Sequence, residues 1–173
     1  PELRKNYRRV VGSLLLKSAH LTTKEQYQAV IDASLTTAFA TVRAAGKTMT
    51  KGGSVVLISS AAAMEGLANH EAIAAAKAGI LGLTLSSAAT YAGQNLRVNA
   101  VAPGLTETPL TAQLTGNETS RKFSEAMHAL GRLGKPEDVA RAICFLLTPE
   151  NNWITGQVLA VDGGLSRVRP KLK

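Results

Sequence analysis

The chain has 173 residues, of which 45% are hydrophobic and 4% aromatic, a composition typical of one aliphatic globular domain. Its net charge of +8 is concentrated in a basic start, residues 1–9, and a basic tail, residues 166–173, so the interior is close to neutral. The interior has neither a basic face nor interleaved aromatic residues, so nucleic-acid binding is not expected. Lys77 and several polar residues interrupt the longest apolar stretch, and a membrane span is not expected either.

Residues that could bind a metal are scattered along the chain. Cys144 is the only cysteine, and its apolar helical surroundings predict a buried structural thiol. The three histidines, His20, His70 and His128, are far apart and show no ligand-like spacing with Asp, Glu or Cys. The sequence therefore predicts no metal site.

The first part of the chain predicts a strand, a long helix and a second strand. An apolar run from Val10 to Leu16 indicates a strand followed by a loop. The capping-box pattern Thr22-Thr23-Lys24-Glu25 predicts the start of a helix that runs to about Thr50. Two glycines end this helix, and the continuous β-branched run over residues 54–59 is typical of a strand buried on both faces.

The second part continues this alternation. The alanine-rich segment from His70 to about Tyr91 predicts a helix that packs closely, and residues 96–102 predict a strand. A looser helical region is expected over residues 110–130, a helix from Pro136 to about Leu147, and a final strand over residues 157–161. Strands that alternate with helices predict a single α/β domain with a parallel sheet.

Five segments resemble the short-chain dehydrogenase/reductase family in order and spacing. They are Gly53–Ser60, Lys77–Gly79, Arg97–Gly104, Gly131–Ala140 and Thr155–Gly164. Each motif is weak alone, but their common order identifies the chain as a member of the family over roughly residues 10 to 165. The resemblance implies a Rossmann-type doubly wound parallel sheet of which this chain supplies only the C-terminal part. The strand near Val10 would be the family's fourth, and residues 1–9 look unlike the family.

The resemblance also implies the catalytic positions. In the family a serine lies 13 residues before the catalytic tyrosine and a lysine four residues after it, and Ser60 and Lys77 keep this register. The tyrosine position is therefore Ile73, and the family's asparagine on the preceding long helix corresponds to Ser34. The family tyrosine exchanges a proton with the substrate oxygen while hydride moves between nicotinamide and carbonyl carbon. Isoleucine cannot carry that proton.

Two polar residues are candidates for a substitute acid. His70 and Glu71 lie three and two residues before Ile73, at the mouth of the expected pocket, and histidine titrates near neutral pH. The alternative is that both residues cap the helix. Tyr91 cannot serve, because it lies 14 residues after Lys77 on the same helix, which is about 20 Å away.

The family's cofactor is NAD or NADP, and the resemblance assigns two contacts to this chain. Lys77 would bind the nicotinamide ribose hydroxyls. The loop from Pro103 to Thr108 resembles the loop that meets the carboxamide and phosphates, with Pro103, Gly104, Thr106 and Thr108 as contacts; a helix cap is the alternative for Thr108. The glycine-rich turn for the pyrophosphate and the ribose-selecting strand are not in the sequence. The part of the family fold that would contain them amounts to roughly 80 residues. Weak or absent cofactor binding is therefore expected.

The resemblance therefore predicts an NAD(P)(H)-dependent oxidoreductase of a carbonyl or alcohol substrate, with an atypical or impaired proton relay. The alternative is a non-catalytic relative that keeps the fold for assembly or binding. Family members form dimers and tetramers through the two long helices and the last strand, here about residues 23–50, 70–91 and 157–161. A homo-oligomer, or a partner that covers the exposed edge of the sheet, is therefore expected.

Overall fold

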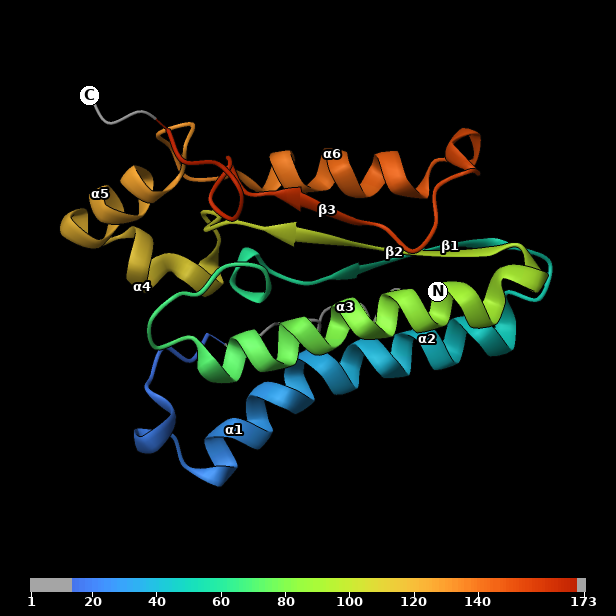
Figure 1. Cartoon of the computed structure of the whole chain (residues 1–173), viewed down its shortest axis with the longest axis horizontal. Coiled ribbons are helices and arrows are strands. Elements are labelled where there is room, and N and C mark those ends of the chain that lie inside the picture. Colours follow the sequence, from blue (N-terminus) through green and yellow to red (C-terminus); the bar gives the residue numbers. More distant parts are fainter. Residues whose placement is uncertain (1–13, 171–173) are drawn as a thin grey trace.

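A three-stranded parallel sheet organises the chain, of which the computed structural model describes residues 14–170. The strands lie in the order β1 (Gly53–Ile58), β2 (Leu96–Pro103) and β3 (Val158–Val161). Figure 1 shows α2 (Thr37–Thr48) and α3 (Glu71–Tyr91) on one face and α6 (Pro136–Leu147) on the other. The predicted α/β fold with a parallel sheet is confirmed. The expected strand near Val10 falls largely outside the described residues, and Leu14–Leu16 is not a strand.

The first long helix is present but irregular in its middle. α1 (Lys24–Ile31) passes through a π-helical segment (Asp32–Thr36) into α2. The helix begins one residue later than its capping pattern predicts. The Thr23 hydroxyl accepts from the Gln26 amide, and the Gln26 side chain accepts from the Thr23 amide, each at 3.2 Å. Glutamine supplies the same reciprocal acceptor as glutamate, so the box lies on this pair and not on Thr22 and Glu25.

The central strand β2 is the most buried element of the sheet. Its register places Leu96 opposite Gly53 of β1 and Ala100 opposite Val158 of β3. Every β2 residue from Leu96 to Ala102 is buried. The expectation that residues 54–59 are buried on both faces is wrong, because Ile58 is 37% exposed. In the described sheet β1 has only one neighbouring strand, and its outer face is less covered than that of β2.

α3 is the core helix of the fold. Its long apolar sequence has the length and composition of a membrane span, but Ala76, Ile80 and Thr84 are buried where α3 packs on β2. Gly79 allows the close approach to the π-helical segment, since a Cβ there would lie 2.8 Å from Leu35 Cδ2. The small residues thus serve packing inside the domain.

The helical segments between β2 and α6 lie near the carboxyl ends of β2 and β3, and α6 covers the face of the sheet opposite α3 (Figure 1). The loosely helical region predicted after β2 contains a 3-10 turn (Pro109–Thr111), α4 (Ala112–Thr115) and α5 (Glu118–Met127). α6 begins at Pro136 and ends at Leu147, as the sequence predicts. The prediction of a buried Cys144 is wrong: the thiol is exposed, and Leu146 is the α6 residue that faces the core. Apolar neighbours in sequence do not define the buried face of an amphipathic helix.

Arg97 ties the end of α6 to the sheet. Its guanidinium is largely buried and donates to the carbonyl oxygens of Leu146, Ile154 and Thr148 at 2.9, 3.1 and 3.2 Å. These bonds satisfy carbonyls that a helix end leaves without partners. One side chain of the central strand therefore stabilises both the α6 terminus and the approach to β3.

We expect Arg97→Ala to lower the free energy of unfolding by about 2–4 kcal/mol, because it removes charge-assisted bonds to carbonyls that remain buried. Arg43→Ala on the exposed side of α2 is the matched control, with a change of about 0.5 kcal/mol or less. Urea denaturation measures both. Equal effects of the two substitutions would contradict the role assigned to Arg97.

Candidate active site

Lys77 and Ser60 lie at the carboxyl end of β1. The Lys77 ammonium donates to the carbonyl of Ile58 at 2.9 Å. Ile58 is the last residue of the strand. The Ser59 hydroxyl donates to the Lys77 carbonyl at 2.8 Å and so joins α3 to the same strand end. Ser60 follows directly, and its hydroxyl oxygen accepts from the Ala62 amide at 3.2 Å. The structure thus brings these two sequence-predicted residues to one edge of the sheet.

The environment of Lys77 is partly buried, and burial lowers the pKa of its ammonium. Removal from water disfavours the charged form, and no carboxylate within residues 14–170 forms an ion pair with this side chain. Among the described residues the ammonium makes one hydrogen bond, to the Ile58 carbonyl, so two of its three N–H donors remain free. It can therefore donate to hydroxyl groups of a bound ligand.

Ile73 lies one helical turn before Lys77 and is only 6% exposed. Its side chain belongs to an apolar cluster whose other members come from α1, α3 and the segments that precede them: Leu14, Leu15, Val30, Ile31, Ala62, Leu67, Ala72 and Ala76. An aliphatic group enclosed in this way can neither donate nor accept a proton. Position 73 is therefore a packing position.

Ser34 lies in the π-helical segment, and its side chain is buried, with 5% of the residue exposed. Among the described residues its hydroxyl has no hydrogen-bond partner. A buried polar group without a partner costs about 1–3 kcal/mol, which native structures tolerate mainly at functional positions. π-helical segments within α-helices are likewise frequent at functional sites.

His70 and Glu71 lie at the start of α3. His70 occupies the N-cap position but makes no side-chain capping bond; its Nδ1 lies 2.8 Å from the Ala68 carbonyl. Because a carbonyl only accepts, Nδ1 carries the hydrogen, and Nε2 of the neutral ring remains available. Glu71 is exposed in the first helical turn. The capping alternative is therefore wrong for the His70 side chain.

Hydrogen bonds within the loop and to β3 hold the loop that follows β2. The Gly104 amide donates to the Val161 carbonyl at 3.1 Å, and the Thr106 hydroxyl donates to the Gly104 carbonyl at 3.1 Å. Thr108 occupies the N-cap of the following 3-10 turn, where its amide donates to the Thr111 hydroxyl at 3.0 Å. The loop from Pro103 to Thr108 is thus a preformed segment at the carboxyl end of the strand beside β1.

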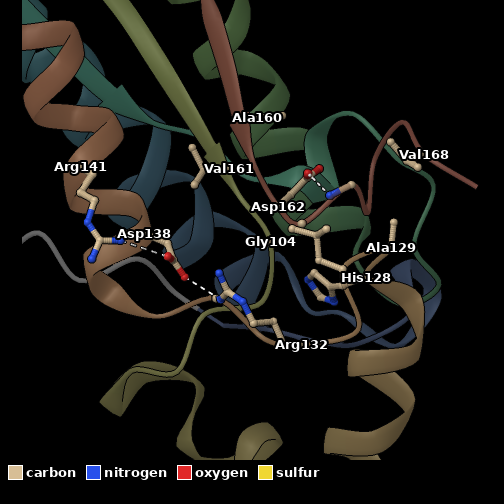
Figure 2. Close-up of a pocket in the computed structure, with 14 residues that line it drawn as sticks. Gly104, His128, Ala129, Arg132, Asp138, Arg141, Ala160, Val161, Asp162 and Val168 are labelled. Carbon is tan, nitrogen blue, oxygen red and sulfur yellow. Dashed lines mark hydrogen bonds and ion pairs between the residues drawn. The ribbon is translucent and has the colours of Figure 1, made fainter. Parts of the chain in front are cut away.

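A cavity of about 510 Å³ opens on the other side of this loop. Figure 2 shows Gly104, His128 and Asp162 on one side of it and Arg132, Asp138 and Arg141 on the other. Asp138 accepts from Arg132 at 2.7 Å and from Arg141 at 3.4 Å. The bond from Arg132 is the main reason that the pKa of Asp138 falls to about 2. The two arginines are therefore held by a carboxylate that stays ionised.

His128 and Asp162 are contacts of the loop region that sequence reasoning missed. The His128 imidazole accepts from the Leu105 amide at 3.2 Å, and Asp162 begins the turn that follows β3. Both partners of the His128 ring are backbone groups. No spacing of side-chain types could have indicated them, because every residue carries such groups.

A parallel sheet covered by helices on both faces, with polar residues at the carboxyl ends of its strands, defines a Rossmann-type α/β protein. A family model described as enoyl-(acyl carrier protein) reductase matches residues 10–166. The chain belongs to the short-chain dehydrogenase/reductase family of oxidoreductases.

Three relatives illustrate the range of the family. The chain is 42% identical to a 3-oxoacyl-[acyl-carrier-protein] reductase of Thermotoga maritima over 82% of its own length and 58% of the relative's. It is 35% identical to an inactive 2-(S)-hydroxypropyl-CoM dehydrogenase of Xanthobacter autotrophicus, over 87% of this chain and 68% of the relative. A solved 4-hydroxyisoleucine dehydrogenase complexed with NADH superposes with a TM-score of 0.86 at 26% identity, over 92% of this chain and 67% of that one.

We expect Ser34→Ala to raise the free energy of unfolding by up to about 1 kcal/mol, because it removes a buried hydroxyl that has no partner among the described residues. Ser59→Ala is the matched control. It makes the same chemical change at another buried serine, but it breaks the bond to the Lys77 carbonyl and should destabilise by about 1 kcal/mol. Opposite signs in thermal unfolding are expected; destabilisation by both would show that Ser34 has a partner.

Proposed function

We propose that this chain carries the Ser60–Lys77 side of an NAD(P)(H)-dependent oxidoreductase site that acts on a carbonyl or alcohol substrate with an altered proton relay. The observation that carries the proposal is the Lys77 ammonium at the end of β1, beside Ser60. The loop from Pro103 to Thr108 follows the neighbouring strand. In open α/β sheets, ligands bind at the carboxyl ends of the strands, where both features lie.

The described residues fit one side of a nicotinamide cofactor. The partly buried ammonium of Lys77 suits the ribose hydroxyls, since it has free donors and no carboxylate partner among residues 14–170. The preformed loop offers Pro103, Gly104, Thr106 and Thr108 for the carboxamide and phosphates. When bound, the cofactor supplies or accepts the hydride. We propose that residues 1–173 alone bind it weakly, because the chain spans 58% of the Thermotoga relative.

The proton would come from a group other than the residue at position 73. Ser60 retains a hydroxyl that can hold the substrate oxygen, but Ile73 is enclosed in apolar side chains. In the protonated imidazole, Nε2 of His70 carries a proton that it could donate while Nδ1 stays bonded to the Ala68 carbonyl, and Glu71 is exposed in the next position. We propose His70, with Glu71 as the second candidate, as the acid of the altered relay.

A non-catalytic relative is the second candidate function. The enclosure of Ile73 favours it, and so does the 35% identity to a dehydrogenase that is described as inactive. In this case the family fold would serve assembly. The outer faces of α2 and α3 would provide the contact, since Phe39 is 57% and Leu85 59% exposed on them. Ala75 of α3 is exposed as well, whereas the neighbouring Ala76 is fully buried in the core.

Ile73→Tyr in the natural full-length polypeptide should raise the rate of NAD(P)H-dependent carbonyl reduction by about 10²–10⁴-fold if the relay is impaired by the isoleucine. Ile73→Phe is the matched control, since it adds the same ring to the apolar cluster without the hydroxyl. Oxidation of the reduced cofactor is followed with a panel of small ketones. An equal increase in reduction rate for Ile73→Phe and Ile73→Tyr would contradict the proposed role of position 73.

A parent protein as active as Ile73→Tyr would point instead to the substitute acid. His70→Ala should then lower kcat by about 10²-fold or more, with little effect on cofactor binding. Glu71→Gln distinguishes the second candidate by the same assay. Activity that survives both substitutions would contradict the altered relay as proposed here.

Leu85→Arg should dissociate an oligomer that uses the outer faces of α2 and α3, because it places an unpaired charge in an apolar contact. Leu21→Arg is the matched control: Leu21 is 56% exposed, similar to Leu85, but lies outside both helices. Multi-angle light scattering measures the mass of each variant. An unchanged mass for Leu85→Arg would exclude this surface as the assembly contact.

A further inference from the structure

His128 connects three segments at the carboxyl edge of the sheet. It follows α5, it is only 3% exposed, and its ring lies between the loop after β2 and the turn after β3. Figure 2 shows the imidazole beside Gly104 and Asp162 at the wall of the cavity. His128 is therefore a titratable side chain whose ring hydrogen bonds hold the surrounding backbone segments together.

The two ring nitrogens of His128 have opposite roles. Nδ1 lies 2.6 Å from the Ser124 carbonyl, which can only accept, so Nδ1 carries a hydrogen. Nε2 lies 3.2 Å from the amide of Leu105, which can only donate, so Nε2 must be bare. The arrangement therefore requires the neutral ring in a single tautomer.

The contact with the loop is close as well as polar. A Cβ on Gly104 would lie 2.7 Å from His128 Nε2 and 2.9 Å from Asp162 Cα. Glycine is therefore the residue that allows the imidazole to reach the Leu105 amide. The loop approaches the ring in the same segment, Pro103 to Thr108, that we assign to the nicotinamide cofactor.

The charged groups around His128 come from several elements. Asp162 interacts with the charge of His128. Burial by itself would raise the pKa of the Asp162 carboxyl, but hydrogen bonds from Ser166 and Gly164, together with the nearby His128, lower it. Groups from the other packed segments are Glu125 on α5, Glu107 within the loop, and Arg132, Asp138 and Arg141 at the cavity. Glu107, Glu125 and Asp138 are each paired with an arginine, whereas the charge interaction of Asp162 is with His128.

We propose that neutral His128 positions the cofactor loop through the Leu105 amide, and that protonation of His128 releases this amide and weakens nicotinamide cofactor binding. The coupling to cofactor rests on the function proposed above. A second proton on the ring turns Nε2 into a donor that faces another donor, so the bond to Leu105 is lost. Histidine changes its charge between about pH 5 and 8. The loop is therefore held while the ring is neutral and released once the ring is protonated.

The direct test is nuclear magnetic resonance of the natural full-length polypeptide from about pH 8 to about pH 5.5. In the parent protein the Leu105 amide resonance should move with the same midpoint as the His128 ring. His128→Gln keeps an acceptor without a titration, so Leu105 should keep its alkaline position throughout. His128→Ala removes the acceptor, and Leu105 should resemble the acidic form at every pH. A Leu105 amide that is insensitive to the titration of His128 overturns the proposal.

NADH and NADPH titrations by fluorescence give the second readout. The Kd of the parent should rise about three- to tenfold across the same pH range, the value expected for one lost hydrogen bond, and that of His128→Gln should stay constant. If His128→Ala does not fold, the glutamine variant still decides the outcome. A Kd with equal pH dependence in parent and glutamine variant overturns the coupling. Absence of cofactor binding at every pH overturns the proposed function instead, even where Leu105 titrates.

Discussion

The attachment of α3 to the end of β1 determines the geometry of the candidate site. Two hydrogen bonds act in opposite directions: the Ser59 hydroxyl donates to the Lys77 carbonyl, and the Lys77 ammonium donates to the Ile58 carbonyl. The first fixes the helix against the strand, and the second aims the lysine at the strand end. Small residues such as Ala76 and Gly79 make this approach possible. The position of Lys77 thus follows from packing and from these two hydrogen bonds inside the domain, without a bond to the side chain at position 73.

Position 73, one helical turn before Lys77, contributes packing alone. Ile73 joins Val30 and Ala62 in an apolar cluster that joins α1 to α3, where an aliphatic side chain stabilises the helix pair. Ser34 is less well accommodated, since its hydroxyl is buried without a partner among the described residues. The two buried positions therefore have different physical consequences. One contributes to the core, and the other leaves a polar group available for a ligand or a water molecule.

Much of the fold could be predicted because hydrophobic period and turn residues are local signals. The run that ends at Ile58, the strand from Leu96 and the helix that begins at Pro136 are all present. The exposure of Ile58 and Cys144 was not predictable, because it depends on which elements cover a strand or helix face. The π-helical segment around Ser34 also left no readable pattern. Backbone irregularities of this kind depend on tertiary packing, and residue type indicates them poorly.

The candidate site also contains some residues that the sequence could indicate and others that it could not. Ser60 and Lys77 could be found because the family resemblance gives their register, and the structure brings both to the end of β1. His128 could not, since its partners are the backbone groups of Leu105 and Ser124. The candidate site therefore combines a rigid side, built on β1 and α3, with a loop whose position depends on one imidazole. A reaction at this site would gain a sensitivity to pH from this second side, and the two sides can be separated by substitution at His128 alone.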